Sequence, residues 1–98
     1  MRTMMTVSIP VEAGNAAIKN NTIGQAVQKF IADYKPEAAY FFVDDQGNRS
    51  SLYVFDLKDP SDIPVIAEPF FLGVNAQVKF RPVMNQQDLA AALARIKP

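Results

Sequence analysis

The stretch EAAYFFVDDQGNRSSLYVFDL, residues 37–57, decides the fold of this 98-residue chain. Its two halves are rich in aromatic and branched residues, and the polar segment DDQGN separates them. Gly47 in that segment supplies the positive φ angle that a tight turn between antiparallel strands needs. The pattern therefore predicts a β-hairpin.

The turn of this hairpin determines which side chains share a face, because neighbouring residues of a strand point to opposite sides. With Gln46 and Gly47 in the turn, the predicted cross-strand pairs are Phe42 with Ser51 and Tyr40 with Tyr53. One face then consists of Tyr40, Phe42, Ser51, Tyr53 and Phe55, and the other of Phe41, Val43, Leu52 and Val54. A register shifted by one residue, or a bulge at Asp44 or Asp45, is the alternative and rearranges these faces.

The sequence before the hairpin predicts one strand and one helix. Residues 4–9 alternate between two sets of side chains, which predicts a strand that ends at the following proline. The segment VEAGN is a predicted loop. Apolar residues then recur at helical spacing over residues 20–35, where Thr22 and Gln25 form a predicted capping box, and Asn15 is an alternative, earlier start. In the strand predicted over residues 4–9, the side chains that face the core are Met5, Val7 and Ile9.

The sequence after the hairpin predicts helix, strand and helix. Residues 59–74 are helical in pattern, with Pro69 as a kink or an end and Gly73 in a left-handed final turn. Residues 75–83 alternate as a strand, and residues 85–96 form a closing helix. The closing helix has capping residues at Asn85 and Asp88 and an apolar stripe of Leu89, Leu93 and Ile96.

The predicted order is strand, helix, strand, strand, helix, strand, helix, in one domain over residues 1–98. The simplest arrangement with right-handed crossovers is an α+β, ferredoxin-like βαββαβ fold with a four-stranded antiparallel sheet and helices on one face. The extra C-terminal helix then packs at an edge of the domain or on a partner.

Composition excludes several function classes. Ten Lys and Arg balance ten Asp and Glu without a run of like charge, so we expect no nucleic-acid partner. Cysteine and histidine are absent, which excludes disulfides, thiol nucleophiles, histidine bases and the usual zinc sites. No apolar run approaches the roughly 20 residues that cross a bilayer, and no signal peptide is recognisable. We expect a cytoplasmic protein that has no membrane partner and requires no cofactor or metal.

The face of the sheet that the helices leave open is predicted to mix aromatic rings with hydroxyls and cations. Its members outside the hairpin are Met4, Thr6, Ser8, Gln77, Lys79 and Arg81. It carries four aromatic rings, and a sheet face of that kind is not stable in water without a cover. A second copy of the same sheet is the simplest cover, since a two-fold axis makes one patch complementary to itself. We therefore expect a homodimer, with Gln77, Lys79 and Arg81 pointing into it.

The order of elements, the acidic loop DLKDPSD at residues 56–62 and the passage AEPFFLGVNAQVKFRPVM at residues 67–84 resemble the dimeric α/β-barrel superfamily, in particular its small uncharacterised members. The resemblance covers nearly the whole chain. It implies that two protomers join their sheets into a barrel, with clefts between sheet and helices that hold small hydrophobic or aromatic ligands. Characterised members include isomerases and cofactor-free monooxygenases, several of which use a histidine that this chain lacks.

Candidate site residues follow from these expectations. The candidates for ligand binding or for the dimer interface are Tyr40, Tyr53, Phe70, Phe71, Lys79 and Arg81. Phenols and cations beside aromatic rings bind carboxylates or phenolates, but the same residue types are also common in dimer interfaces. Asp44 and Asp45 are expected to serve the turn, because neighbouring strand residues point to opposite faces.

A small-molecule-binding or purely structural homodimer is the first functional expectation. The alternative is a cofactor-independent enzyme, in which Glu68, partly desolvated beside Pro69, accepts a proton while Arg81 holds an anion and Tyr53 lies in the same cavity. An exposed Glu68 is the ordinary outcome for this residue type. A regulatory, effector-sensing module is the third possibility.

Overall fold

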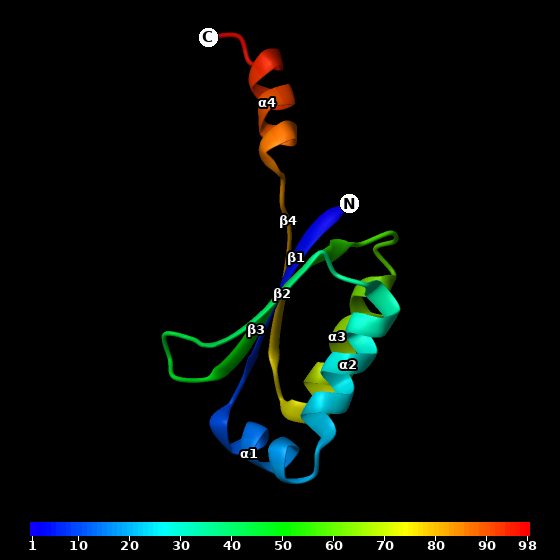
Figure 1. The fold of residues 1–98 in the computed structure, drawn as a ribbon, viewed down its shortest axis with the longest axis vertical. Coiled ribbons are helices and arrows are strands. Elements are labelled where there is room, and N and C mark those ends of the chain that lie inside the picture. Colours follow the sequence, from blue (N-terminus) through cyan, green and yellow to red (C-terminus); the bar gives the residue numbers. More distant parts are fainter.

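The computed structural model describes residues 1–98 and has an α+β, ferredoxin-like architecture, as predicted. Its elements are β1 (Arg2–Ile9), α1 (Val11–Lys19), α2 (Thr22–Tyr34), β2 (Ala38–Val43), β3 (Arg49–Asp56), α3 (Asp62–Val74), β4 (Gln77–Pro82) and α4 (Gln86–Arg95). The strands form one antiparallel sheet in the order β2-β3-β1-β4. Helices α2 and α3 lie together on one side of this sheet, and α1 lies at the end where β1 stops (Figure 1).

The core lies between the sheet and helices α2 and α3. Met5 at the centre of β1 pairs with Tyr53 of β3 and Phe80 of β4, so these three adjacent strands present a continuous apolar surface. Phe30 of α2 packs on that surface, with ring centroids 4.8 Å from Tyr53 and 5.2 Å from Phe55. Each large side chain buried in this way contributes about 1.5–3 kcal/mol. The buried cluster comprises Met5, Val7, Ile9, Ala17, Phe30, Tyr53, Phe55, Ile66, Phe70, Val74 and Ala76.

The predicted register of the hairpin is wrong by one residue. Tyr40 pairs with Leu52 and Phe42 pairs with Ser50. The turn contains three residues rather than two, because the Asp44 carboxylate accepts hydrogen bonds from the backbone N–H groups of Gln46 and Asn48, both at 3.0 Å. The Asp44 N–H donates to the Asn48 carbonyl at 2.9 Å and closes the loop, with Gly47 at φ 78°.

This shift moves every side chain of β3 to the other face. Ser51, Tyr53 and Phe55 face the helices and are buried, whereas Leu52 and Val54 lie on the helix-free face. The faces predicted for β1, β2 and β4 are confirmed. The helix-free face therefore retains two of the four predicted aromatic rings, and Leu52 and Val54 take the positions expected for the others.

The first helical region also differs from the prediction. The segment predicted as a loop forms α1, which begins directly after Pro10, and the chain then turns into α2. Pro10 is suited to this junction, since a proline ends the strand and needs no N–H at a helix start. The predicted capping box of α2 is not formed. The Asn20 side chain accepts from the N–H and the hydroxyl of Thr22 instead, at 3.2 and 2.8 Å.

Helix α3 continues through Pro69, which was predicted to kink or end it. A proline inside a helix removes one N–H from the hydrogen-bond ladder, and its ring crowds the carbonyl four residues earlier. Phe70 and Val74 beyond it are buried in the core, and this packing favours a continued helix. The left-handed turn that ends α3 is at Asn75, with φ 52°, and not at Gly73.

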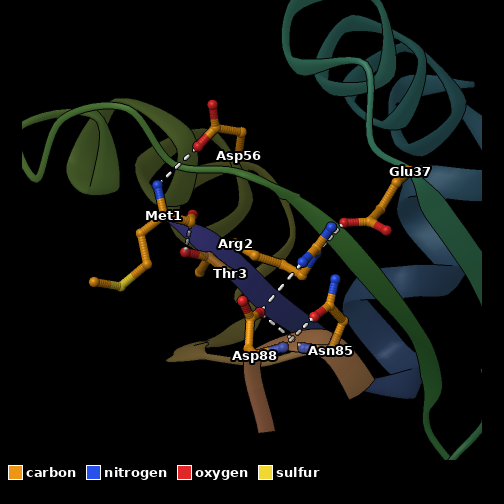
Figure 2. Close-up of polar contacts among 7 residues, drawn as sticks. All are labelled: Met1, Arg2, Thr3, Glu37, Asp56, Asn85 and Asp88. Atoms are coloured by element: carbon orange, nitrogen blue, oxygen red, sulfur yellow. Dashed lines mark hydrogen bonds and ion pairs between the residues drawn. The ribbon is translucent and has the colours of Figure 1, made fainter. Parts of the chain in front are cut away.

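Helix α4 has the predicted capping box, in which Asn85 and Asp88 exchange hydrogen bonds of 2.8 and 3.0 Å. The helix projects beyond the sheet at the end of β4 and contains no buried residue (Figure 1). It gives the molecule a radius of gyration of 15.6 Å, against about 13 Å for a compact chain of this length. Arg2 of β1 forms ion pairs with Asp88 in the first turn of α4, at 3.6 Å, and with Glu37 just before β2, at 2.6 Å. Figure 2 shows Arg2 between these two carboxylates.

Candidate functional site

A cleft of about 410 Å³ opens between α2 and the hairpin formed by β2 and β3. It exists because the helices do not extend over the edge strand: Phe41 and Val43 point to the helix side of β2 yet are 60% and 71% exposed. The residues that line the cleft are Val7, Ile9, Ile23, Gly24, Val27, Gln28, Phe41, Phe42, Arg49, Ser50, Ser51 and Phe70. A largely apolar cleft of this size with a few polar groups is the usual form of a small-molecule site.

Arg49 is the only ionisable residue that lines the cleft. It stands at the start of β3, opposite Ile9, and its side chain turns toward α1. Its Nη2 donates to the Asn15 side-chain oxygen at 3.1 Å, and its Nη1 donates to the Val11 carbonyl at 3.5 Å. Both acceptors are neutral, and no carboxylate lies within ion-pair distance of the guanidinium.

Tyr53 lies beneath the cleft, in the core, with an exposed fraction of 0%. Its ring makes an edge contact with Phe41, with the centroids 6.0 Å apart. Burial raises the pKa of the phenol, and the neighbouring Ser51 hydroxyl opposes that shift without meeting the geometry of a hydrogen bond. The Tyr53 hydroxyl is consequently buried without a partner.

The predicted site residues do not gather at one place. Phe70 lines the cleft, and Tyr53 lies below it. Phe71 is 40% exposed on α3 and lines neither the cleft nor the core. Lys79 and Arg81 are exposed on the helix-free face of β4. Tyr40 lies on the same side of the sheet, but on β2 at the opposite edge, with β3 and β1 between them.

The three residues required for the enzymatic alternative do not meet in one cavity. Glu68 is exposed on α3, and Arg81 lies on the side of the sheet opposite to Tyr53. No Asp, Glu or Lys lines the cleft, and the chain contains no histidine or cysteine, so the cleft has no side chain suited to act as a general base.

The helix-free face combines apolar side chains with one strongly hydrogen-bonded carboxylate. Tyr40 and Phe42 are 66% and 44% exposed there. Asp44, where the face meets the turn, accepts from the hydroxyls of Ser8 and Ser50, both at 2.7 Å. Hydrogen bonds from the Asn48 backbone and from these hydroxyls lower the pKa of Asp44 to about 2. Its role is in the turn, as predicted. The remaining apolar members of the face are Met4, Ala38, Leu52 and Val54.

The other surfaces offer weaker starting points for a site. A second cavity, of about 480 Å³, is lined by charges of both signs with Tyr34 and Phe55 as its only apolar residues. No group of three acidic side chains is arranged to hold a metal ion. None of the helices has the length and apolar character needed to span a bilayer.

Arg49 was missed by the sequence reasoning, which looked for cations on β4. Arg49 is the first residue after the turn segment, and it alternates with Ser51, Tyr53 and Phe55 along the same face of β3. This alternation is visible in the sequence. Only the correct register assigns Arg49 to that face, and the predicted register assigned it to the other.

Comparison with known proteins supports the fold and goes no further. No protein-family model matches the chain, and no curated protein matches it either. Among solved structures, the crystal structure of a formyltetrahydrofolate deformylase from Pseudomonas putida KT2440 is similar, with a TM-score of 0.53 and 12% sequence identity. The similarity covers 85% of this chain and 29% of the deformylase chain, so it concerns a part of that protein.

Proposed function

We propose that this protein binds a small apolar or aromatic molecule in the cleft between α2 and the β2–β3 hairpin, and that it does so without catalysing a reaction. The observation that carries the proposal is the cleft itself: seven of its twelve lining residues are apolar, and its volume lies in the range of small-molecule sites. The lack of a general base in the lining argues against proton-transfer chemistry.

We further propose that the protein is a homodimer of the dimeric α/β-barrel kind, joined through its helix-free sheet faces. Only 15 of the 98 residues are buried within one chain, and Tyr40 and Phe42 remain exposed on that face. A stable interface covers about 800 Å² per partner, which is roughly one-eighth of the 6861 Å² surface of the chain. Leu89 and Leu93 on α4, with Ile96 directly after the helix, are exposed and form a second apolar surface without a cover.

The cleft proposal is tested with the uncharged fluorescent probe N-phenyl-1-naphthylamine. Val27→Trp places a large ring in the cleft, and we expect it to abolish the rise in probe fluorescence that the unmodified protein produces. Leu72→Trp is the matched control, because Leu72 is 82% exposed at the end of α3 and lines no part of the cleft. Equal probe binding by the two variants would refute the proposal.

The dimer proposal is tested by native mass spectrometry of freshly purified protein, which also reports any retained small molecule. Tyr40→Glu introduces a charge into the proposed interface, and we expect the dimer dissociation constant to rise about 100-fold or more. Phe71→Glu makes the same kind of change at an exposed aromatic residue on α3 and is expected to remain dimeric. A monomeric unmodified protein at micromolar concentration would overturn this proposal.

A further inference from the structure

We infer that the ligand of the cleft is an anion, a small monocarboxylate with an aromatic or branched aliphatic body, and that Arg49 binds its carboxylate. This inference rests on the proposed binding function of the cleft and specifies the chemical class of the ligand. It is independent of the dimer.

The charge of Arg49 has no counter-ion within the chain. Its guanidinium has five N–H donors, of which two meet the neutral oxygens of Val11 and Asn15. A half-buried cation beside apolar side chains is poorly solvated, and an anionic ligand compensates its charge there. A carboxylate suits the remaining donors, since its two oxygens match the planar fork of a guanidinium.

The position of the guanidinium is set by a glycine. A Cβ atom at Gly14 would lie 2.6 Å from Arg49 Nη1 and 3.3 Å from the Ile9 side chain. Gly14 is buried on α1, so the guanidinium rests against helix backbone at a place where any other residue would displace it. Three neighbours therefore hold the Arg49 head group at the cleft: the Gly14 backbone, the Val11 carbonyl and the Asn15 side chain.

Two other features of the cleft favour the same ligand. Ile23 and Gly24 in the first turn of α2 line it, and the N-terminal turn of a helix carries partial positive charge. The Ser51 hydroxyl lies on the same strand face as Arg49, two residues along β3. The rest of the lining is largely apolar and accommodates the body of the ligand. Its members are Val7, Val27, Phe41 and Phe70.

Isothermal titration calorimetry with 1-naphthaleneacetate and its neutral analogue 1-naphthaleneacetamide tests the inference on the unmodified protein. The two probes share one apolar body and differ in charge. We expect the acid to bind about 10- to 100-fold more tightly than the amide, the difference typical of a hydrogen bond to a charged group. The preference is expected to fall as salt is added.

Two variants then assign the preference to Arg49. Arg49→Gln is expected to remove the preference for the acid, because the acid loses its charged partner and its affinity falls further than that of the amide. Gly14→Ala retains the charge but displaces the end of a flexible side chain, so it is expected to reduce the preference. Arg81→Gln on the opposite face is the control and is expected to retain it. The comparison on the unmodified protein remains decisive if Arg49→Gln fails to fold.

The outcomes separate this inference from the proposed function. Equal affinity for acid and amide, with Val27→Trp still blocking both, would overturn the carboxylate inference and leave the cleft as a binding site. A preference for the acid that survives Arg49→Gln would also overturn it. Failure of both probes to bind at millimolar concentration would overturn the carboxylate inference and the proposed function together.

Discussion

Removing the hydroxyl of Tyr53 should stabilise the protein, whereas most substitutions at buried positions are destabilising. Tyr53 has an exposed fraction of 0%, and its Oη has no hydrogen-bond partner. A buried polar group without a partner costs about 1–3 kcal/mol. Tyr53→Phe retains the ring contacts with Phe30 and Phe41 and removes this cost. We expect the free energy of unfolding to rise by about 1 kcal/mol, which corresponds to about 4–8 °C in Tm for a domain of this size.

The measurement is urea unfolding at neutral pH, followed by circular dichroism at one protein concentration. Tyr34→Phe is the matched control, because the Tyr34 ring belongs to the same aromatic cluster, 5.3 Å from Phe30, but is only partly buried. We expect the control to lie within about 0.5 kcal/mol of the unmodified protein.

Alkaline pH gives a second readout of the same hydroxyl. Burial raises the pKa of the Tyr53 phenol above its usual value of 10.0. The folded state therefore favours the protonated form of the phenol. The resulting contribution to the free energy of unfolding is present below pH 10 and is lost as the pH rises through the folded-state pKa. The stability advantage of Tyr53→Phe over the unmodified protein should grow in that range.

At neutral pH, a fall of about 1 kcal/mol or more in the unfolding free energy on Tyr53→Phe would refute the reasoning. It would mean that the hydroxyl makes a hydrogen bond in solution.

Three further predictions concern the turn, α3 and α4. Asp44→Asn should destabilise the protein above about pH 4. The lowered pKa of Asp44 means that its ionised form stabilises the folded state. The difference in unfolding free energy between variant and unmodified protein should therefore shrink as the pH falls through about 2, where acid protonates this carboxylate. Pro69→Ala should raise the free energy of unfolding by about 1–3 kcal/mol in urea titrations, since alanine restores an N–H to the interior of α3; a decrease would show that proline rigidity dominates there. Asn85→Ala should weaken α4 by about 0.5–2 kcal/mol and lower its helical circular dichroism signal, while Gln86→Ala, beside it, should leave that signal unchanged.

Several features of the fold were predictable because they depend on residues close together in the sequence. Alternating side chains gave the strands, Gly47 gave the turn, and Asn85 with Asp88 gave the start of α4. The element order then restricted the topology to the ferredoxin-like arrangement that the structure has.

The helix that continues through Pro69 was not predictable in the same way. A proline inside a helix has a local free-energy cost, but the burial of Phe70 and Val74 against the sheet outweighs it. That packing involves strands distant in the sequence. Helix α1 was missed for a related reason. It has only nine residues, and it is held by Ala17 in the core and by the contact of Gly14 with Arg49.

Apart from α1, the sequence by itself determined which segments are strands and helices and in what order they follow. It also determined the apolar face of each strand except β3. Only the tertiary structure decided the register of the hairpin, because Asp44 binds the turn and also Ser8 of a distant strand. A shift of one residue exchanges the two faces of a strand. That single choice buries Tyr53 and brings Arg49 to the cleft, so the candidate site depends on long-range contacts that periodicity does not encode.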